Sequence, residues 1–173
     1  MIRAELPPYE GDTAHLRKMF SYFPSGVVAL LANVGGTPKG MVASSFTVGV
    51  SMEPPLVSCA IRRQSSTWPE LKGAHRIGIS VFGEDQGEMA RQISSKSIAS
   101  RFEKIPLRHA DSSALFIAQA PVWFECSFAD ELPAGDHTIA LLEVHRGGAD
   151  PELPPLVFYG STFRQLQVSS ADG

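Results

Sequence analysis

Residues 40–61 read GMVASSFTVGVSMEPPLVSCAI, and this stretch decides the fold. Its β-prone runs predict strands over residues 40–46, 48–51 and 56–61. Because proline has no backbone N–H to donate, Glu53-Pro54-Pro55 separates the second strand from the third. The third run is apolar enough to predict burial on both of its faces.

More strands are expected on both sides of this stretch. Residues 27–32 form a continuous β-prone run, and turn-forming residues at 33–38 predict a hairpin with the strand at 40–46. Further strands are predicted over residues 77–82, 115–118, 122–128, 138–145 and 156–159. Gly147-Gly148 follows the strand at 138–145.

Short helices interrupt these strands. They are expected over residues 13–20, near 67–70 and over 85–93, and a mobile loop or weak helix is expected at 94–101. Asp12 or Thr13 can cap the first helix. Thr67 and Glu70 have the spacing of a capping box for the second. Antiparallel strands with a few short helices favour a closed or nearly closed β-barrel, which avoids exposed sheet edges.

The composition describes a single soluble domain. The chain has 173 residues, is 43% hydrophobic and carries a formal net charge of -3. We expect the domain at 13–167, with an N-terminal extension at 1–12 and a tail at 168–173. The slight acidity gives no reason to expect a nucleic acid or an anionic membrane as partner. With no apolar leader or membrane-length segment, the protein is expected in the cytoplasm.

Several familiar sites are missing from the sequence. It contains no Gly-x-Gly-x-x-Gly after a strand, no Walker loop, no His-Glu-x-x-His and no Gly-x-Ser-x-Gly. Its five histidines do not cluster, so no metal site is predicted. Cys59 and Cys126 lie far apart in apolar runs and are expected to be small buried hydrophobes.

Two polar segments could bind a ligand. The small residues of 40–51 would let a flat ligand approach the backbone, with hydroxyls at Ser44, Ser45 and Thr47; the alternative is an ordinary Ser/Thr-rich strand end. Residues 62–67, Arg-Arg-Gln-Ser-Ser-Thr, join a strand to a helix start and could bind an anion. Plain helix capping with two solvated arginines is the alternative there.

The order of several motifs resembles the flavin reductase-like family, over about residues 20–166. The motifs are Phe23-Pro24-Ser25-Gly26-Val27, Gly40 through Thr47, Ser51 through Val57, Ile77 through Val81, Gly135-Asp136-His137-Thr138 and Pro155 through Gly160. The resemblance implies a flavin-binding split β-barrel of Greek-key type that forms homodimers. It also implies an NAD(P)H-dependent enzyme that reduces FMN or FAD and supplies reduced flavin to a partner monooxygenase.

The resemblance also implies roles for individual residues. The flavin ring would lie along Ala43, Ser44, Ser45 and Phe46, with Thr47 and Ser51 close by. The ribityl-phosphate segment would be Gln64, Ser65, Ser66 and Thr67, and Ser94, Ser95 and Arg101 would close over the phosphate or adenylate end. The nicotinamide would meet His137, as the catalytic residue that orients it, together with Gly160 and Phe163.

One residue and one segment depart from the family pattern. Val42 stands where many members have threonine, and Thr47-Val48-Gly49-Val50-Ser51 is one residue longer than usual, which predicts a β-bulge that re-aims Ser51. Two other functions fit the same architecture: a flavin- or haem-binding carrier or sensor without turnover, and a deazaflavin-dependent oxidoreductase.

Overall fold

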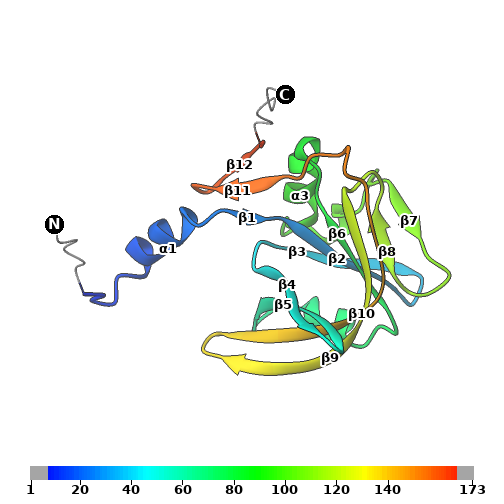
Figure 1. The fold of residues 1–173 in the computed structure, drawn as a ribbon, viewed down its shortest axis with the longest axis horizontal. Coiled ribbons are helices and arrows are strands. Elements are labelled where there is room, and N and C mark those ends of the chain that lie inside the picture. The colour runs from blue at the N-terminus through cyan, green and yellow to red at the C-terminus, as the bar shows by residue number, and fades with distance from the viewer. Residues whose placement is uncertain (1–7, 167–173) are drawn as a thin grey trace.

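The computed structural model describes residues 8–166 and is mainly β (Figure 1). Its central sheet has seven strands in the order β3-β2-β6-β9-β10-β5-β4, and every neighbouring pair is antiparallel. The strands are β2 (Val28–Val34), β3 (Thr37–Ala43), β4 (Phe46–Met52), β5 (Pro55–Arg62), β6 (Ile77–Val81), β9 (Val122–Ala134) and β10 (His137–Ala149). The predicted mainly β class is confirmed.

The connection between β3 and β4 makes the sheet coil. These are the two edge strands of the sheet, yet only residues 44 and 45 separate them in the chain. The sheet must therefore curve round until its edges nearly meet, which gives the split barrel. The predicted bulge is also present, because the pairing of β4 with β5 shifts register between Thr47 and Ser51, where Gly49 has a φ of 69°.

Smaller elements cover the barrel. Two short sheets pair β7 (Leu107–His109) with β8 (Leu115–Ile117), and β11 (Val157–Tyr159) with both β1 (Ser25–Gly26) and β12 (Thr162–Arg164). The helices are α1 (Thr13–Ser21), α2 (Trp68–Lys72) and α3 (Gly87–Ile93), with 3-10 turns at Glu84–Gln86 and Ile98–Ser100. Asp12 caps α1 by accepting from the amides of Ala14 and His15.

Two apolar cores lie on either side of β2. Alternate residues of β2 face the barrel interior, where Val28 and Leu30 pack with Val57 and Cys59 of β5. The residues between them face outward, into a second core with α3, β8 and Leu156. β2 is thus buried on both faces, as is β6 over residues 77–80. The prediction that residues 56–61 are buried on both faces is wrong, because β5 alternates between buried and partly exposed residues.

Other predicted boundaries change for physical reasons. Strands β9 and β10 pair far beyond the predicted 122–128 and 138–145, and β10 runs through Gly147 and Gly148 to Ala149. The capping box at Thr67 is not formed: its side chain makes no cap hydrogen bond, and Ser65 Oγ accepts from the Trp68 amide instead, at 3.2 Å. The proposed tail at 168–173 and most of the extension at 1–12 lie outside the described residues.

The helix α1 projects away from the barrel as an arm (Figure 1). None of its residues is buried, and Phe20 is 66% exposed although it belongs to the predicted apolar stripe. No helix in residues 8–166 is long and apolar enough to cross a membrane.

Candidate functional site

One hollow of about 770 Å³ gathers four separate segments of the chain. The end of β3 and the turn after it form one wall, and the end of β5 with the loop before α2 forms another. The end of α3 with its following loop, and the first residue of β10, complete the site. Its lining residues are Met41 through Ser45, Ala60, Ile61, Arg62, Gln64 through Thr67, Ile93, Ser94, Lys96, Arg101 and His137.

The wall formed by β3 and β5 has small side chains. Ala43 and Ala60 leave backbone accessible to a flat ligand. Ser45 is held against β5, because its Oγ donates to the Ala60 carbonyl at 2.9 Å and lies 3.6 Å from Cys59 Sγ. Burial raises the pKa of the Cys59 thiol, so this cysteine is a protonated packing group, as predicted.

The other end of the hollow is rich in hydroxyls and cations. Arg101 ties the loop after α3 to the loop before α2: its Nε donates to the Ser95 carbonyl at 2.8 Å, and its Nη1 donates to Thr67 Oγ1 at 3.4 Å. Lys96 and Ser66 also line this end. Guanidinium, ammonium and hydroxyl donors together can bind a phosphate.

His137 is placed by strand pairing. As the first residue of β10 it lies opposite Arg62 of β5, which brings it to the edge of the hollow. Its Nδ1 lies 2.7 Å from Asp136 Oδ1. This hydrogen bond from His137 lowers the pKa of Asp136. With Asp136 accepting, Nδ1 carries the proton and Nε2 is left to meet a ligand.

The structure brings together ten of the predicted site residues. Ala43, Ser44, Ser45, Gln64, Ser65, Ser66, Thr67, Ser94, Arg101 and His137 all line the hollow. Phe163 lines a smaller adjoining pocket of about 180 Å³, which shares Val42, Ala43, Ser44 and Ser94 with the hollow.

Other predicted site residues lie outside the hollow. Phe46 points into the barrel core, with its ring 6.2 Å from that of Phe124. Thr47 and Ser51 lie further along β4, at the bulge. Ser95 contributes its carbonyl to Arg101. Gly160 forms the turn before β12 with a φ of 61°, and its amide donates to the Ser21 carbonyl at 2.7 Å.

Two cationic residues of the hollow were given no individual role by the family resemblance, although Arg62 belongs to the predicted anion-binding segment 62–67. Lys96 follows α3, and Arg62 ends β5 beside His137. The basic residues within 94–101 and 62–67 were visible in the sequence, but which of them face the hollow depends on how the loops fold.

A carboxylate outside the hollow anchors α2. Glu131 of β9 accepts from Lys72 Nζ at 2.6 Å and from Trp68 Nε1 at 3.1 Å. The hydrogen bond from Lys72, followed by that from Trp68, lowers the pKa of Glu131. Because the pKa is lowered on folding, this stabilisation is present above the unfolded pKa and is lost as the pH falls through the folded one.

We expect Glu131→Gln to lower Tm at neutral pH, because the ion pair with Lys72 is lost. The difference in Tm between the variant and the wild type should narrow as the pH falls through the acidic range, where Glu131 itself becomes protonated. Thermal unfolding followed by circular dichroism across pH checks this. Glu88→Gln, which removes a surface pair with Arg91, is the matched control and should change Tm little. A difference independent of pH would contradict the assignment.

Comparison with known proteins assigns the chain to a family. The family model described as "Flavin reductase like domain" matches residues 19–167. The chain is 33% identical over 156 residues to the actinorhodin polyketide dimerase of Streptomyces coelicolor, covering 90% of this chain and 87% of that protein. It is 28% identical to the reductase component of a 4-nitrophenol 4-monooxygenase/4-nitrocatechol 2-monooxygenase from Rhodococcus opacus, covering 88% of this chain and 80% of that one.

The fold is also that of a solved structure. The NADH:FAD oxidoreductase of Streptomyces globisporus, solved with NAD and FAD fragments, superposes with a TM-score of 0.86 at 32% identity, covering 98% of this chain and 100% of that chain.

Proposed function

The chain belongs to the flavin reductase-like family, and from this we propose that it is an NAD(P)H:flavin oxidoreductase. It reduces FMN or FAD with a hydride from NADH or NADPH. The observation that carries the proposal is the hollow itself, which joins a small-residue wall, a cationic hydroxyl-rich end and His137 in one space of about 770 Å³.

The hollow fits a flavin at both of its ends. The accessible backbone at Ala43, Ser44 and Ser45 suits the flat ring, and Ser45 is already fixed by its bond to Ala60. Ser66, Thr67 and Arg101 suit the phosphate, because two hydrogen bonds to the protein hold Arg101 in place. The same donors serve FMN and FAD.

When bound, the flavin supplies the ring that accepts the hydride, so the chain's own residues act by positioning. Asp136 fixes the His137 ring through Nδ1 and leaves Nε2 to hold the nicotinamide carboxamide. Phe163, in the adjoining pocket, covers the nicotinamide from the side of α3. Its ring is itself fixed, with the Arg91 guanidinium carbon 4.9 Å away and the ring of Phe158 at 5.8 Å.

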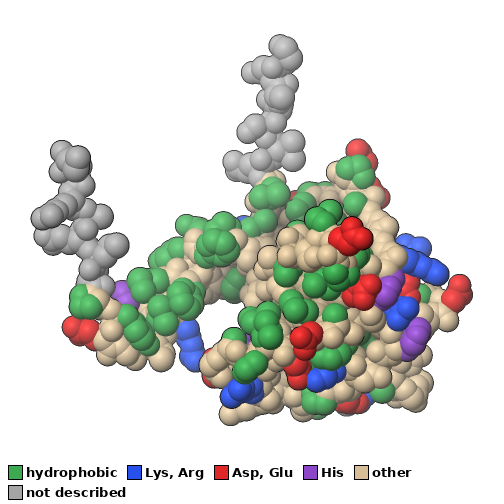
Figure 2. All heavy atoms as spheres, turned by 60° about the horizontal axis from the view of Figure 1, so that its bottom comes forward, with side chains coloured by type: hydrophobic (Ala, Val, Ile, Leu, Met, Phe, Trp, Pro, Cys, Tyr) green, Lys and Arg blue, Asp and Glu red, His purple; other side chains and the backbone are tan. Residues whose placement is uncertain are grey.

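We propose that the enzyme is a homodimer. Figure 2 shows hydrophobic side chains gathered along the α1 arm, where Met19 and Phe20 are 46% and 66% exposed, and Phe23, just after the helix, is 76% exposed. On β4, Val48 and Met52 are also largely exposed. An apolar arm with no buried residue is stabilised when a second copy covers it.

The reduced flavin is proposed to pass to a partner monooxygenase. The relative from Rhodococcus opacus, itself a reductase component, supports this. The cytoplasm is the proposed location, which the two free cysteines support.

Anaerobic titration tests the activity. Adding NADH or NADPH to the protein with FMN or FAD should bleach the flavin band as the nicotinamide is oxidised. Binding of flavin without bleaching would replace the proposal with a carrier or sensor. An intense Soret band from the purified protein would indicate haem, and turnover only with a deazaflavin would indicate the third alternative.

The same assay tests the site. Arg101→Ala should weaken flavin binding about tenfold, because a charge-assisted hydrogen bond to phosphate is lost. Arg108→Ala removes an arginine outside the hollow and serves as the control. If Arg101→Ala bound flavin as tightly as Arg108→Ala does, the assignment of Arg101 to the phosphate would be contradicted.

A further inference from the structure

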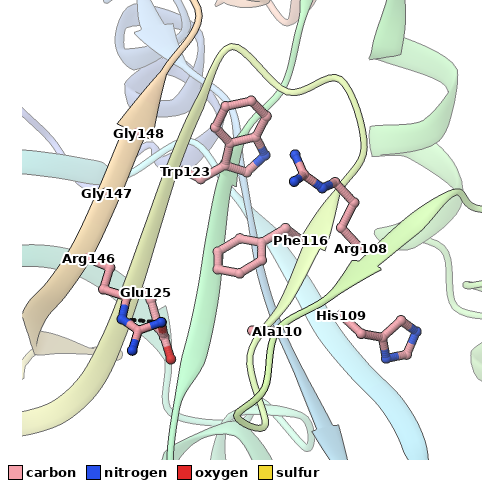
Figure 3. A pocket seen from close by; sticks show the side chains of 9 residues that line it. All are labelled: Arg108, His109, Ala110, Phe116, Trp123, Glu125, Arg146, Gly147 and Gly148. Atoms are coloured by element: carbon pink, nitrogen blue, oxygen red, sulfur yellow. Dashed lines mark ion pairs between the residues drawn. The ribbon is translucent and has the colours of Figure 1, made fainter.

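A second pocket lies between the β7–β8 hairpin and the paired strands β9 and β10 (Figure 3). It has a volume of about 310 Å³ and shares no residue with the proposed flavin site. Its lining is Arg108, His109, Ala110, Phe116, Trp123, Glu125, Arg146, Gly147 and Gly148.

Strand register builds the floor of this pocket. Trp123 and Glu125 are two residues apart on β9, so they share one face of the sheet. Their partners on β10 are Gly148 and Arg146, respectively. The register shifts between Val144 and Arg146, and this irregularity places Arg146 opposite Glu125.

The floor presents flat aromatic surface. Leu115 and Ile117 of β8 are buried in the outer core, so Phe116 between them points the other way, into the pocket beside Trp123 (Figure 3). Gly148 has no side chain to cover the indole. A Cβ built there would lie 3.8 Å from Trp123 Cε3, an ordinary contact distance.

The charges of the pocket favour an anion. The guanidinium carbon of Arg108 lies 5.7 Å from the centroid of the Trp123 ring. Arg146 is 79% exposed, and its Nε lies 3.7 Å from Glu125 Oε2. Glu125 is buried at the back of the pocket, where it accepts a hydrogen bond from Ser112 Oγ at 2.7 Å. The accessible groups are therefore the two guanidinium groups and the exposed His109 imidazole, while the single carboxylate is partnered by Ser112 and Arg146.

We propose that this pocket binds a small planar aromatic carboxylate. The ring would lie against Phe116 and Trp123, and the carboxylate would pair with the guanidinium groups of Arg108 and Arg146. A volume of about 310 Å³ is at the lower end of ligand pockets and suits one or two fused rings. The inference does not depend on flavin reduction.

Calorimetric titration of the full-length protein tests the ligand class. Benzoate and 2-naphthoate are the probes; cyclohexanecarboxylate, which lacks the aromatic face, should bind several-fold more weakly. Benzylamine carries the opposite charge and should not bind. Tighter binding of benzylamine than of benzoate would overturn the proposal, and so would the absence of binding by both aromatic acids.

Variants test the location. Gly148→Leu should abolish binding by filling the space over the indole, and Arg108→Ala and Arg146→Ala should each weaken it about tenfold. Arg164→Ala, an exposed arginine on β12, is the matched control and should bind as wild type does. An unchanged Tm shows that each variant is folded. This control and the binding assay do not depend on flavin reduction. Undiminished binding by Gly148→Leu together with both pocket arginine variants would place the ligand elsewhere and overturn the proposal.

Discussion

His137→Ala lowers kcat/KM for NADH by about 100-fold while the Kd for flavin changes only slightly, which is the expected result if this side chain orients the nicotinamide. His137 lies where β10 begins, at the edge of the hollow, and Asp136 fixes its ring at 2.7 Å. Misplacing a reacting group by about 1 Å costs a factor of this order. In the proposed role His137 contacts the hydride donor, so flavin affinity should depend on other residues.

Steady-state NADH oxidation and an independent flavin titration measure the two quantities separately. His75→Ala is the matched control, because His75 is exposed and lies outside the hollow. Asp136→Asn retains the ring but weakens its anchor, and should give an intermediate loss of kcat/KM. An active His137→Ala enzyme would contradict the assigned role, while a loss confined to flavin binding would move His137 to the flavin.

Gly78→Ala is expected to destabilise the fold by about 3 kcal/mol or more, because it forces backbone apart. Gly78 is the second residue of β6, and the β7–β8 hairpin crosses directly over it. A Cβ at this position would be 2.0 Å from the Leu115 carbonyl oxygen and 2.8 Å from its carbon. Both atoms belong to backbone, so no side-chain rotation relieves the contact.

Urea unfolding measures this loss. Gly26→Ala is the control, since a Cβ at Gly26 meets nothing within 4 Å and its φ is not positive. That substitution should change the free energy of unfolding by less than about 1 kcal/mol. If Gly78→Ala were as stable as Gly26→Ala, the hairpin could not cross β6 as closely as described.

Much of the fold follows from sequence, because local pattern and tertiary packing agree. The β-prone run at 27–32 corresponds to β2, and the proline break at 53–55 falls between the end of β4 and the start of β5. The prediction was wrong where tertiary packing determines the burial or the length of a strand. Nothing local shows that β2 is covered on both faces while β5 is not, since both are short apolar runs. Gly147-Gly148 seemed to end a strand, yet the ladder with β9 continues through both glycines.

The candidate site was predicted only in part, again because local sequence does not determine tertiary packing. Ser45 and Thr67 lie in segments whose composition left a ligand site and an ordinary structural role both open, and the family resemblance implied their roles at the flavin. Lys96 was missed, and Arg62 was predicted only as part of the anion-binding segment 62–67, because which basic residues face the hollow depends on how the loops fold. Phe46 belongs to the same motif as Ser45, but strand alternation sends its ring into the barrel core instead.

The position of β2 between two cores also has a consequence for how the domain unfolds. Every residue from Val28 to Ala32 is buried, and successive side chains belong to different cores. The barrel interior and the outer layer with α3 therefore share one backbone segment and cannot melt separately. We therefore expect the amides of β2 to exchange in the slowest class, which opens only in global unfolding, and the domain to unfold as one cooperative unit.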